Sequence, residues 1–308
     1  MNESSPLISV VIPTFNRGER IRVAIDSALN QTWPRLEIVV VDDCSSDDTW
    51  DVVQSYGNRI RPIRLSENRG GGYARNVGID AAKGEFVAFL DCDDYWAPEK
   101  LAEQARLIPP DHDKMVIYNR VVQVVGERLV PTPLHAWTAD IPIDEYIVVR
   151  KQSMQTSGLM IARKFAHDVR FDDSLRKHQD VDFVFSLANE GGKFIFCSAE
   201  TVFYENTTLA GRVSTTPAPE RTEILIAKWG AFLTPRTKAY YRAVTIAPMQ
   251  LRVSVTRSTM TLVLSLPYAL EFAKDVMEGF ILWNTSEATY NKIRRLYGAI
   301  RRHRRTVQ

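Results

Sequence analysis

Cysteine is scarce in this sequence, with three residues in 308 and no Cys-x-x-Cys pair. Cys44, Cys92 and Cys197 lie far apart, so their spacing indicates neither a zinc motif nor a disulfide framework. Reduced cysteines are typical of a cytoplasmic protein, and we expect that location. Residues 1–5 are polar and Leu7 already begins an apolar run, a pattern that does not resemble a secretory signal.

Long apolar runs and a strong net charge are also missing. In the C-terminal third, the longest stretch without Asp, Glu, Lys or Arg has 13 residues, 258–270, and contains Pro267. A spanning helix needs about 20 apolar residues, so we expect no transmembrane segment. The net charge of +2 argues against a nucleic-acid partner bound through bulk charge. With 45% apolar residues, the chain is an ordinary globular protein, long enough for two domains.

The first hundred residues contain a regular alternation of apolar runs and amphipathic segments. The apolar runs predict strands at 7–12, 36–41, 60–65 and 86–90, and helical spacing predicts helices at 21–29, 48–56 and 74–81. Such alternation favours a parallel sheet with helices on both faces. The loop after each parallel strand reaches the same edge of the sheet, so polar residues in these loops would share one crevice.

The pattern changes after about residue 110. Further strands are expected at 116–118, 121–125, 147–149, 158–161 and 194–196, with a helix at about 180–189. From about residue 219 the pattern is helical, and the tail from Lys292 to Gln308 holds seven Lys or Arg and no acid. The tail composition fits two roles, contact with anionic lipid headgroups and a solvated basic end.

The most informative stretch is 84–94, where five apolar residues run directly into Asp91, Asp93 and Asp94. Carboxylates this close repel one another, so their grouping favours a divalent cation between them. An acidic turn that opens a helix with Pro98 near its start explains the same residues without a metal. The stretch alone does not decide between these interpretations.

In four segments the sequence resembles the inverting family 2 glycosyltransferases, which have the GT-A fold: PTFN (13–16), VVVDDCS (39–45), ENRGGGYARNVGI (67–79) and AAKGEFVAFLDCDD (81–94). The resemblance is close over about 7–101 and looser to about 215. It implies an α/β, Rossmann-like nucleotide-sugar-binding sheet with an acceptor-side extension and a helical C-terminal region. The implied domains are 1–218, with a nucleotide-sugar half at about 7–110 and an acceptor half at about 111–218, and then 219–308.

The resemblance assigns roles on the donor side. Asp91 and Asp93 match the two acids of the family's DxD motif, which hold Mn²⁺ or Mg²⁺ on the diphosphate of the donor. Asp94 is a less certain third acid, with capping of a helix near Trp96 as its alternative. Asp43 matches an acid that accepts from uracil, with capping of the next helix as the alternative. The other implied donor-binding residues are Pro13, Thr14, Phe15, Asn68, Arg75 and Arg212.

Inversion requires a base that removes the proton of the acceptor hydroxyl, and Asp180 matches the family's base. Gln179 stands where the family usually has Glu, which is a departure from the motif. Asp182 is the reserve candidate for the base. His178 is a candidate to orient Asp180, although a histidine beside a helix start is more often structural.

The resemblance therefore implies a metal-dependent glycosyltransferase that moves a sugar from a UDP-sugar to a glycan or lipid-linked acceptor in cell-surface polysaccharide synthesis. The implied partners are the donor, the acceptor and, through the basic tail, the inner face of a membrane. Two alternatives are open. A catalytically silent nucleotide-sugar-binding protein would fit Gln179. A sugar nucleotidyltransferase is disfavoured because its Gly-rich basic loop is absent after the first strand, where residues 13–17 read PTFNR.

Overall fold

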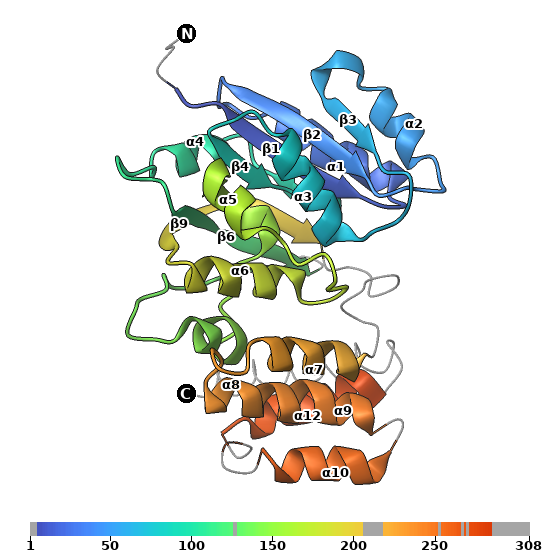
Figure 1. Cartoon of the computed structure of the whole chain (residues 1–308), viewed down its shortest axis with the longest axis vertical. Coiled ribbons are helices and arrows are strands. Elements are labelled where there is room, and N and C mark those ends of the chain that lie inside the picture. Colours follow the sequence, from blue (N-terminus) through green and yellow to red (C-terminus); the bar gives the residue numbers. More distant parts are fainter. Residues whose placement is uncertain are drawn as a thin grey trace. The chain divides into compact units, whose positions relative to one another are not determined.

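The computed structural model describes residues 5–125, 128–205, 218–251, 254–265, 268 and 271–284. The chain divides into two compact units, residues 1–208 and 209–308 (Figure 1). Residues 206–217 lie outside the described residues, and so does Arg212 among them. The domain boundary after residue 218 stays a prediction.

Unit 1 begins with a parallel sheet made from the predicted apolar runs. In spatial order its strands are β3 (Arg61–Arg64), β2 (Leu36–Asp42), β1 (Ile8–Thr14) and β4 (Phe86–Phe89). β1 pairs in parallel with both β2 and β4, and β2 pairs in parallel with β3. Every residue of β1 and β4 is buried, as expected for strands that are covered on both faces.

Helices α1 (Gly18–Leu29), α2 (Thr49–Gln54) and α3 (Gly71–Ala81) alternate with these strands, so the predicted α/β alternation is confirmed. In α1, the apolar positions at helical spacing, including Ile21 and Ile25, are the buried ones. Figure 1 shows α3 crossing one face of the sheet, where it packs on β1 and β2.

The sheet continues with mixed strand directions. The further strands are β5 (Asp94–Trp96), β6 (Met115–Val125), β7 (Arg128–Thr132), β8 (Leu159–Ala162) and β9 (Lys193–Glu205). Among the described residues the sheet has nine strands in the order β3-β2-β1-β4-β8-β6-β9-β5, with β7 paired to β6. β8 is antiparallel to β4 and β6, and only β9 runs parallel to β6. The parallel arrangement predicted from the sequence therefore holds for the first four strands alone.

Helices α4 (Lys100–Ala105), α5 (Arg163–Val169) and α6 (Gln179–Asn189) complete this part of the chain. Two local predictions are wrong. Residues 147–149 lie in a π-helical turn, Glu145–Val149, and not in a strand. No helix begins near Trp96, because Asp94–Trp96 pairs with residues 202–204 of β9 as β5.

Aromatic and amide contacts join the segment before α6 to the parallel sheet. The rings of Phe171 and Phe183 stack at 3.8 Å, and both meet Phe89 of β4 edge-on at 5.4 and 6.1 Å. Asn76 of α3 donates to the carbonyl of Phe171 (2.8 Å) and accepts from its N–H (2.9 Å), as a neighbouring strand would. These contacts fix the start of α6 relative to the ends of β1 and β4.

Unit 2 is helical where it is described, as predicted. Its helices are α7 (Pro219–Lys228), α8 (Pro235–Tyr240), α9 (Ala247–Gln250), α10 (Val255–Val263) and α12 (Ala273–Asn284), with a π-helical segment at Tyr241–Ile246. Within the described part of the chain, no helix combines the length and the apolar character that a membrane span requires. The basic tail at 292–308 lies outside the described residues.

Candidate active site

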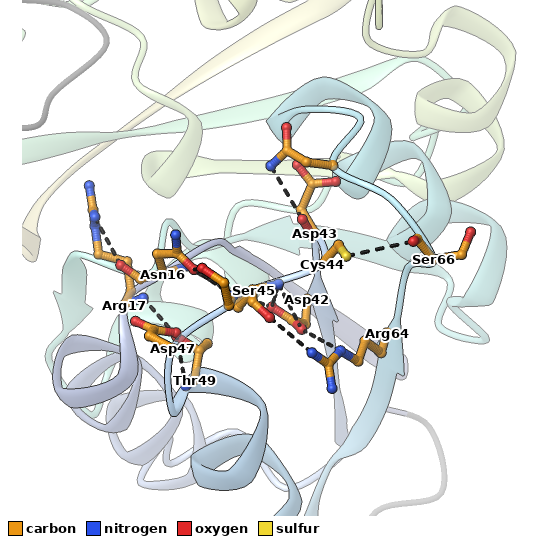
Figure 2. A network of polar contacts seen from close by, with 12 residues as sticks. Asn16, Arg17, Asp42, Asp43, Cys44, Ser45, Asp47, Thr49, Arg64 and Ser66 are labelled. Atoms are coloured by element: carbon orange, nitrogen blue, oxygen red, sulfur yellow. Dashed lines mark hydrogen bonds and ion pairs between the residues drawn. The ribbon is translucent and has the colours of Figure 1, made fainter.

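The loops after β1 and β2 are joined by a polar network (Figure 2). Asn16 donates its backbone N–H to Ser45 Oγ (2.9 Å), and its side-chain oxygen accepts from the N–H of Ser46 (2.8 Å). Asn16 thus links two loops and does not cap α1, whose N-cap is Arg17. Beneath them the fully buried Asp42 accepts from Ser45 N at 3.2 Å. This network fixes the shape of the strand ends on which a ligand would rest.

Among the three implied donor-binding residues at the end of β1, Phe15 is the one with an exposed face. It is 42% exposed, whereas Pro13 and Thr14 are buried at the end of β1. An exposed ring at the carboxyl end of a parallel strand is available for stacking on a flat ligand.

Asp43 holds the glycine-rich loop against the end of β2. Its carboxylate accepts from the N–H groups of Arg69 and Gly70, each at 2.7 Å, and the side-chain amide of Asn68 donates to its carbonyl at 3.2 Å. Burial raises the pKa of Asp43, and the two backbone hydrogen bonds act against this rise. Asp43 therefore does not cap α2, where Asp47 accepts from Thr49 N at 3.0 Å.

Gly70 has a backbone conformation in which any other residue would be strained. Its φ is +91°, and a Cβ there would lie 2.4 Å from Nη1 of Arg176. Arg176 itself donates to Asn68 Oδ1 at 3.4 Å, and its positive charge limits the rise in the pKa of Asp43. The sequence reasoning did not identify Arg176, because no local pattern connects it to a loop more than a hundred residues earlier.

Arg75 connects the strand-end acid to the start of α6. One guanidinium nitrogen, Nη2, pairs with Asp91 Oδ1 at 2.5 Å, and Nη1 donates to Gln179 Oε1 at 3.2 Å. Arg75 is 9% exposed and its guanidinium lies 5.3 Å from the ring centre of Phe171. Two predicted site residues, Arg75 and Asp91, are thus in direct contact, and Arg75 is buried.

Gln179 uses both ends of its amide. The oxygen accepts from Arg75, and the nitrogen donates to the carbonyl of Leu175 at 2.6 Å. The glycine-rich loop makes room for it, since a Cβ on Gly72 would lie 3.4 Å from Gln179 Nε2. Gln179, which replaces the family's usual Glu, is therefore held by specific contacts on both sides of its amide.

The acidic loop after β4 is held from below by Ser157, which is fully buried. The Ser157 hydroxyl accepts from Asp91 N (3.0 Å) and donates to Asp94 Oδ2 (2.5 Å). Asp94 is 7% exposed and opens β5, so it points into the protein and caps no helix near Trp96. Sequence reasoning missed Ser157 because it lies 66 residues from Asp91.

The two acids expected to hold a cation remain accessible. The Asp91 side chain is 31% exposed, and Asp93 is partly exposed. Burial raises the pKa of Cys92 between them to about 12, with the charges of Asp93 and Asp91 adding to the rise, so its thiol stays protonated. Within the described residues there is no group of three or more His, Cys, Asp or Glu side chains that could hold a metal. The site offers two hard oxygen donors.

Asp180 lies in the first turn of α6, beside Gln179. Burial raises the pKa of Asp180, and the charge of Asp91 raises it further, while the Val181 N–H and Arg75 lower it. Asp182 is fully buried, so it cannot meet an acceptor from solution. Burial lowers the pKa of His178 to about 4, which keeps this left-handed N-cap residue (φ 63°) neutral near pH 7.

Comparison with known proteins gives a family match. A model described as glycosyl transferase family 2 matches residues 9–169. The amylovoran biosynthesis glycosyltransferase AmsB of Erwinia amylovora is 33% identical over 213 residues, which are 66% of this chain and 71% of that protein. The UDP-Glc:alpha-D-GlcNAc-diphosphoundecaprenol beta-1,3-glucosyltransferase WfaP of Escherichia coli is 40% identical over 99 residues, which are 32% of this chain and 39% of that protein.

Among solved structures, the crystal structure of S. aureus TarS 1–349 in complex with UDP-GlcNAc is similar, with a TM-score of 0.62 and 22% identity. The match covers 90% of this chain and 83% of that one. At this identity the likeness concerns the fold, and it confirms the predicted GT-A architecture.

Proposed function

Since the chain belongs to glycosyl transferase family 2, we propose that it transfers a sugar from a UDP-sugar to a hydroxyl group of a glycan or lipid-linked acceptor, with inversion. The names of AmsB and WfaP support a step in cell-surface polysaccharide synthesis. The observation that carries the proposal is the double contact of Arg75, which brings Asp91 after β4 next to the turn of α6 that holds Asp180.

The donor is bound by the strand-end loops. Phe15, with its exposed ring, stacks on the uracil base. The carboxylate of Asp43 keeps spare acceptor capacity beyond its two backbone bonds, and this capacity serves the base. Pro13, Thr14 and Asn68 belong to the same donor site, and the resemblance assigns Arg212, which lies outside the described residues, to the diphosphate.

A divalent cation fits Asp91 and Asp93. Hard cations prefer carboxylate oxygen and both acids are accessible, so Asp91 and Asp93 would hold the cation together with oxygens of the donor diphosphate. Mn²⁺ or Mg²⁺ bound there supplies positive charge for the leaving UDP. Arg75 supplies a second positive charge at the same carboxylate, which holds Asp91 in place before the donor arrives.

Asp180 acts as the base. Burial raises its pKa and the charge of Arg75 opposes that rise, so the ionised carboxylate is a better proton acceptor than an ordinary aspartate. Asp180 takes the proton of the acceptor hydroxyl as that oxygen attacks the anomeric carbon from the face opposite to UDP. The attack from the opposite face produces the inversion.

Replacement of Asp180 by Asn tests this assignment. The variant should lose transfer, by a factor of about 10² to 10⁴, and still bind UDP with Mn²⁺ at the wild-type affinity. UDP release from UDP-sugars gives the rate, and calorimetry gives the affinity. Asp173→Asn is the matched control, since Asp173 is a half-exposed acid of the same segment that pairs with Arg69.

Normal turnover by Asp180→Asn would refute the base assignment. If the wild-type protein binds UDP-sugars yet releases no UDP with any donor and acceptor, the silent binding protein becomes the better interpretation. The family match leaves no support for the sugar nucleotidyltransferase alternative.

A further inference from the structure

Helix α10 of unit 2 exposes its apolar side chains. Val255, Met260, Val263 and Leu264, which directly follows the helix, are 65%, 66%, 54% and 64% exposed. At 100° per residue, the exposed positions 255, 256, 259, 260, 263 and 264 cover an arc of about 180°. Half of the helix surface is thus a mostly apolar face that nothing in the described part of the chain covers.

The opposite side of α10 is packed within unit 2 through several polar residues, with Leu262 beside them. Ser258 is 2% exposed and donates to the carbonyl of Ala247 (2.9 Å), and Thr261 donates to Gln250 Oε1 (2.7 Å). Ser265, just after the helix, is fully buried. A helix on a protein in water normally shows the reverse pattern, with its apolar stripe inward. Figure 1 shows α10 beside α9, which carries these two partners.

The sequence around this face carries only positive charge. Residues 224–270 hold six Lys or Arg and no Asp or Glu. One of the six, Arg257, is exposed on α10 at the edge of the apolar arc, where its long side chain can reach past the apolar residues. The acids that follow have partners: Glu271, before α12, pairs with Arg236, and within α12 Asp275 accepts from the Tyr240 hydroxyl and Glu278 pairs with Lys274.

We propose that α10 is a membrane-docking helix, whose face of Val255, Met260, Val263 and Leu264 enters the headgroup boundary of a bilayer rich in anionic lipid. An apolar helix face flanked by basic residues is the combination that binds such an interface. The charge pattern selects this occupant, because the segment 224–270, which carries α10, holds six basic residues and no acid, so it would attract anionic headgroups and repel the same segment of a second copy. The proposal does not depend on the donor, the acceptor or the base.

Vesicle flotation of the full chain tests the proposal. Wild-type protein should float with vesicles of phosphatidylcholine containing 30% phosphatidylglycerol, and much less with phosphatidylcholine alone. The double substitution Met260→Glu and Val263→Glu should lower the bound fraction at least tenfold. A matched control, Leu129→Glu with Met277→Glu, changes two other exposed apolar residues, 61% and 54% exposed, and should bind like wild type.

Two measurements separate this idea from its competitors. UDP release with a water-soluble acceptor should be unchanged in the Met260→Glu and Val263→Glu protein, so loss of vesicle binding is not loss of folding or of catalysis. Light scattering with size exclusion gives the oligomeric state. The proposal is overturned if the double variant floats like wild type, if wild type does not float, or if the substitutions instead dissociate an oligomer.

Discussion

The exchange of Gln179 for Glu, the residue that the family usually has there, should destabilise this protein. In the structure the amide accepts from Arg75 Nη1 at 3.2 Å and donates to the Leu175 carbonyl at 2.6 Å. A carboxylate can make the first contact but has no hydrogen to make the second. Its other oxygen would face a carbonyl oxygen at hydrogen-bond distance.

The opposing contributions can be compared. The contact with Arg75 would become charge-assisted, a gain of about 1 kcal/mol. Loss of the bond to Leu175 removes about 1 kcal/mol, and the unsatisfied charged oxygen left against the carbonyl costs about 1–3 kcal/mol. A new negative charge near Asp91 and Asp180 adds repulsion. The net expectation is a loss of about 1–3 kcal/mol in the free energy of unfolding.

Thermal and urea unfolding at neutral pH measure this loss. In a unit of 208 residues, 1 kcal/mol shifts Tm by roughly 2–4 °C, so Gln179→Glu should lower Tm by roughly 2–12 °C. Gln152→Glu is the matched control. Like Gln179, Gln152 uses both ends of its amide: its oxygen accepts from the Leu134 N–H and its nitrogen donates to the Arg150 carbonyl. These bonds lie at the surface, and the oxygen bonds a backbone N–H in place of an arginine side chain. Its exchange should cost less than half as much.

Activity gives a second, independent reading. The added charge should raise the pKa of Asp180 further and move the acid limb of the pH–rate profile to higher pH. The reasoning fails if Gln179→Glu is as stable as wild type and has an unshifted profile. That result would mean that the Glu carboxylate is fully hydrogen-bonded by other groups at the start of α6.

Three further outcomes follow from the buried groups of unit 1. The rate of sugar transfer should fall as the pH drops through the pKa of Asp180, because only the ionised carboxylate accepts a proton. Burial and the charge of Asp91 raise that pKa above the ordinary 3.8 of an aspartate. Initial rates between pH 4 and 8 measure this fall. Ser157→Ala should lower the free energy of unfolding by about 1–3 kcal/mol, measured by urea titration, and raise the Mn²⁺ concentration that gives half the maximal rate. The control Ser153→Ala removes a buried hydroxyl with no partner among the described residues, and it should change neither quantity. Lys100→Met should stabilise the protein near pH 7 by about 1–3 kcal/mol, since Lys100 Nζ is fully buried and has no hydrogen-bond partner within the described residues. Burial holds the pKa of Lys100 in the folded protein well below 10.5, so between its folded and unfolded pKa the unfolded chain binds more protons and stability rises with pH. Urea midpoints at several pH values should show this rise in the wild-type protein and not in Lys100→Met.

The parallel part of the fold was predictable from the sequence because its signals are local. Unbroken apolar runs such as Val10–Ile12 and Val39–Val41 mark strands that are covered on both faces, and both runs are fully buried. The loops after parallel strands lie at one edge of a sheet, so Asp43 after β2 and Asp91 after β4 were expected at the same edge. The contact of Arg75 with Asp91 lies at the end of β4. The strands and helices of the first hundred residues, which depend on local periodicity, were therefore predicted, whereas the strand predicted for the short apolar run at 147–149 is wrong.

The remaining features depend on long-range contacts. β5 exists because Asp94–Trp96 pairs with residues 202–204. Ser157 supports Asp91 from 66 residues away, and Gln179 meets Arg75 across 104 residues. None of these contacts leaves a periodic pattern at either end, so no reading of one segment reveals them.

The paired hydrogen bonds between Asn76 and Phe171 bear on how the chain denatures. A side-chain amide that exchanges two bonds with a peptide unit, at 2.8 and 2.9 Å, ties α3 to the segment before α6 at a buried point. Within the described residues, one nine-stranded sheet also joins the strands before residue 110 to those after it. We therefore expect these two stretches to unfold together, and a fragment cut near residue 110 would expose the flank of β4 and leave Asn76 without its partner.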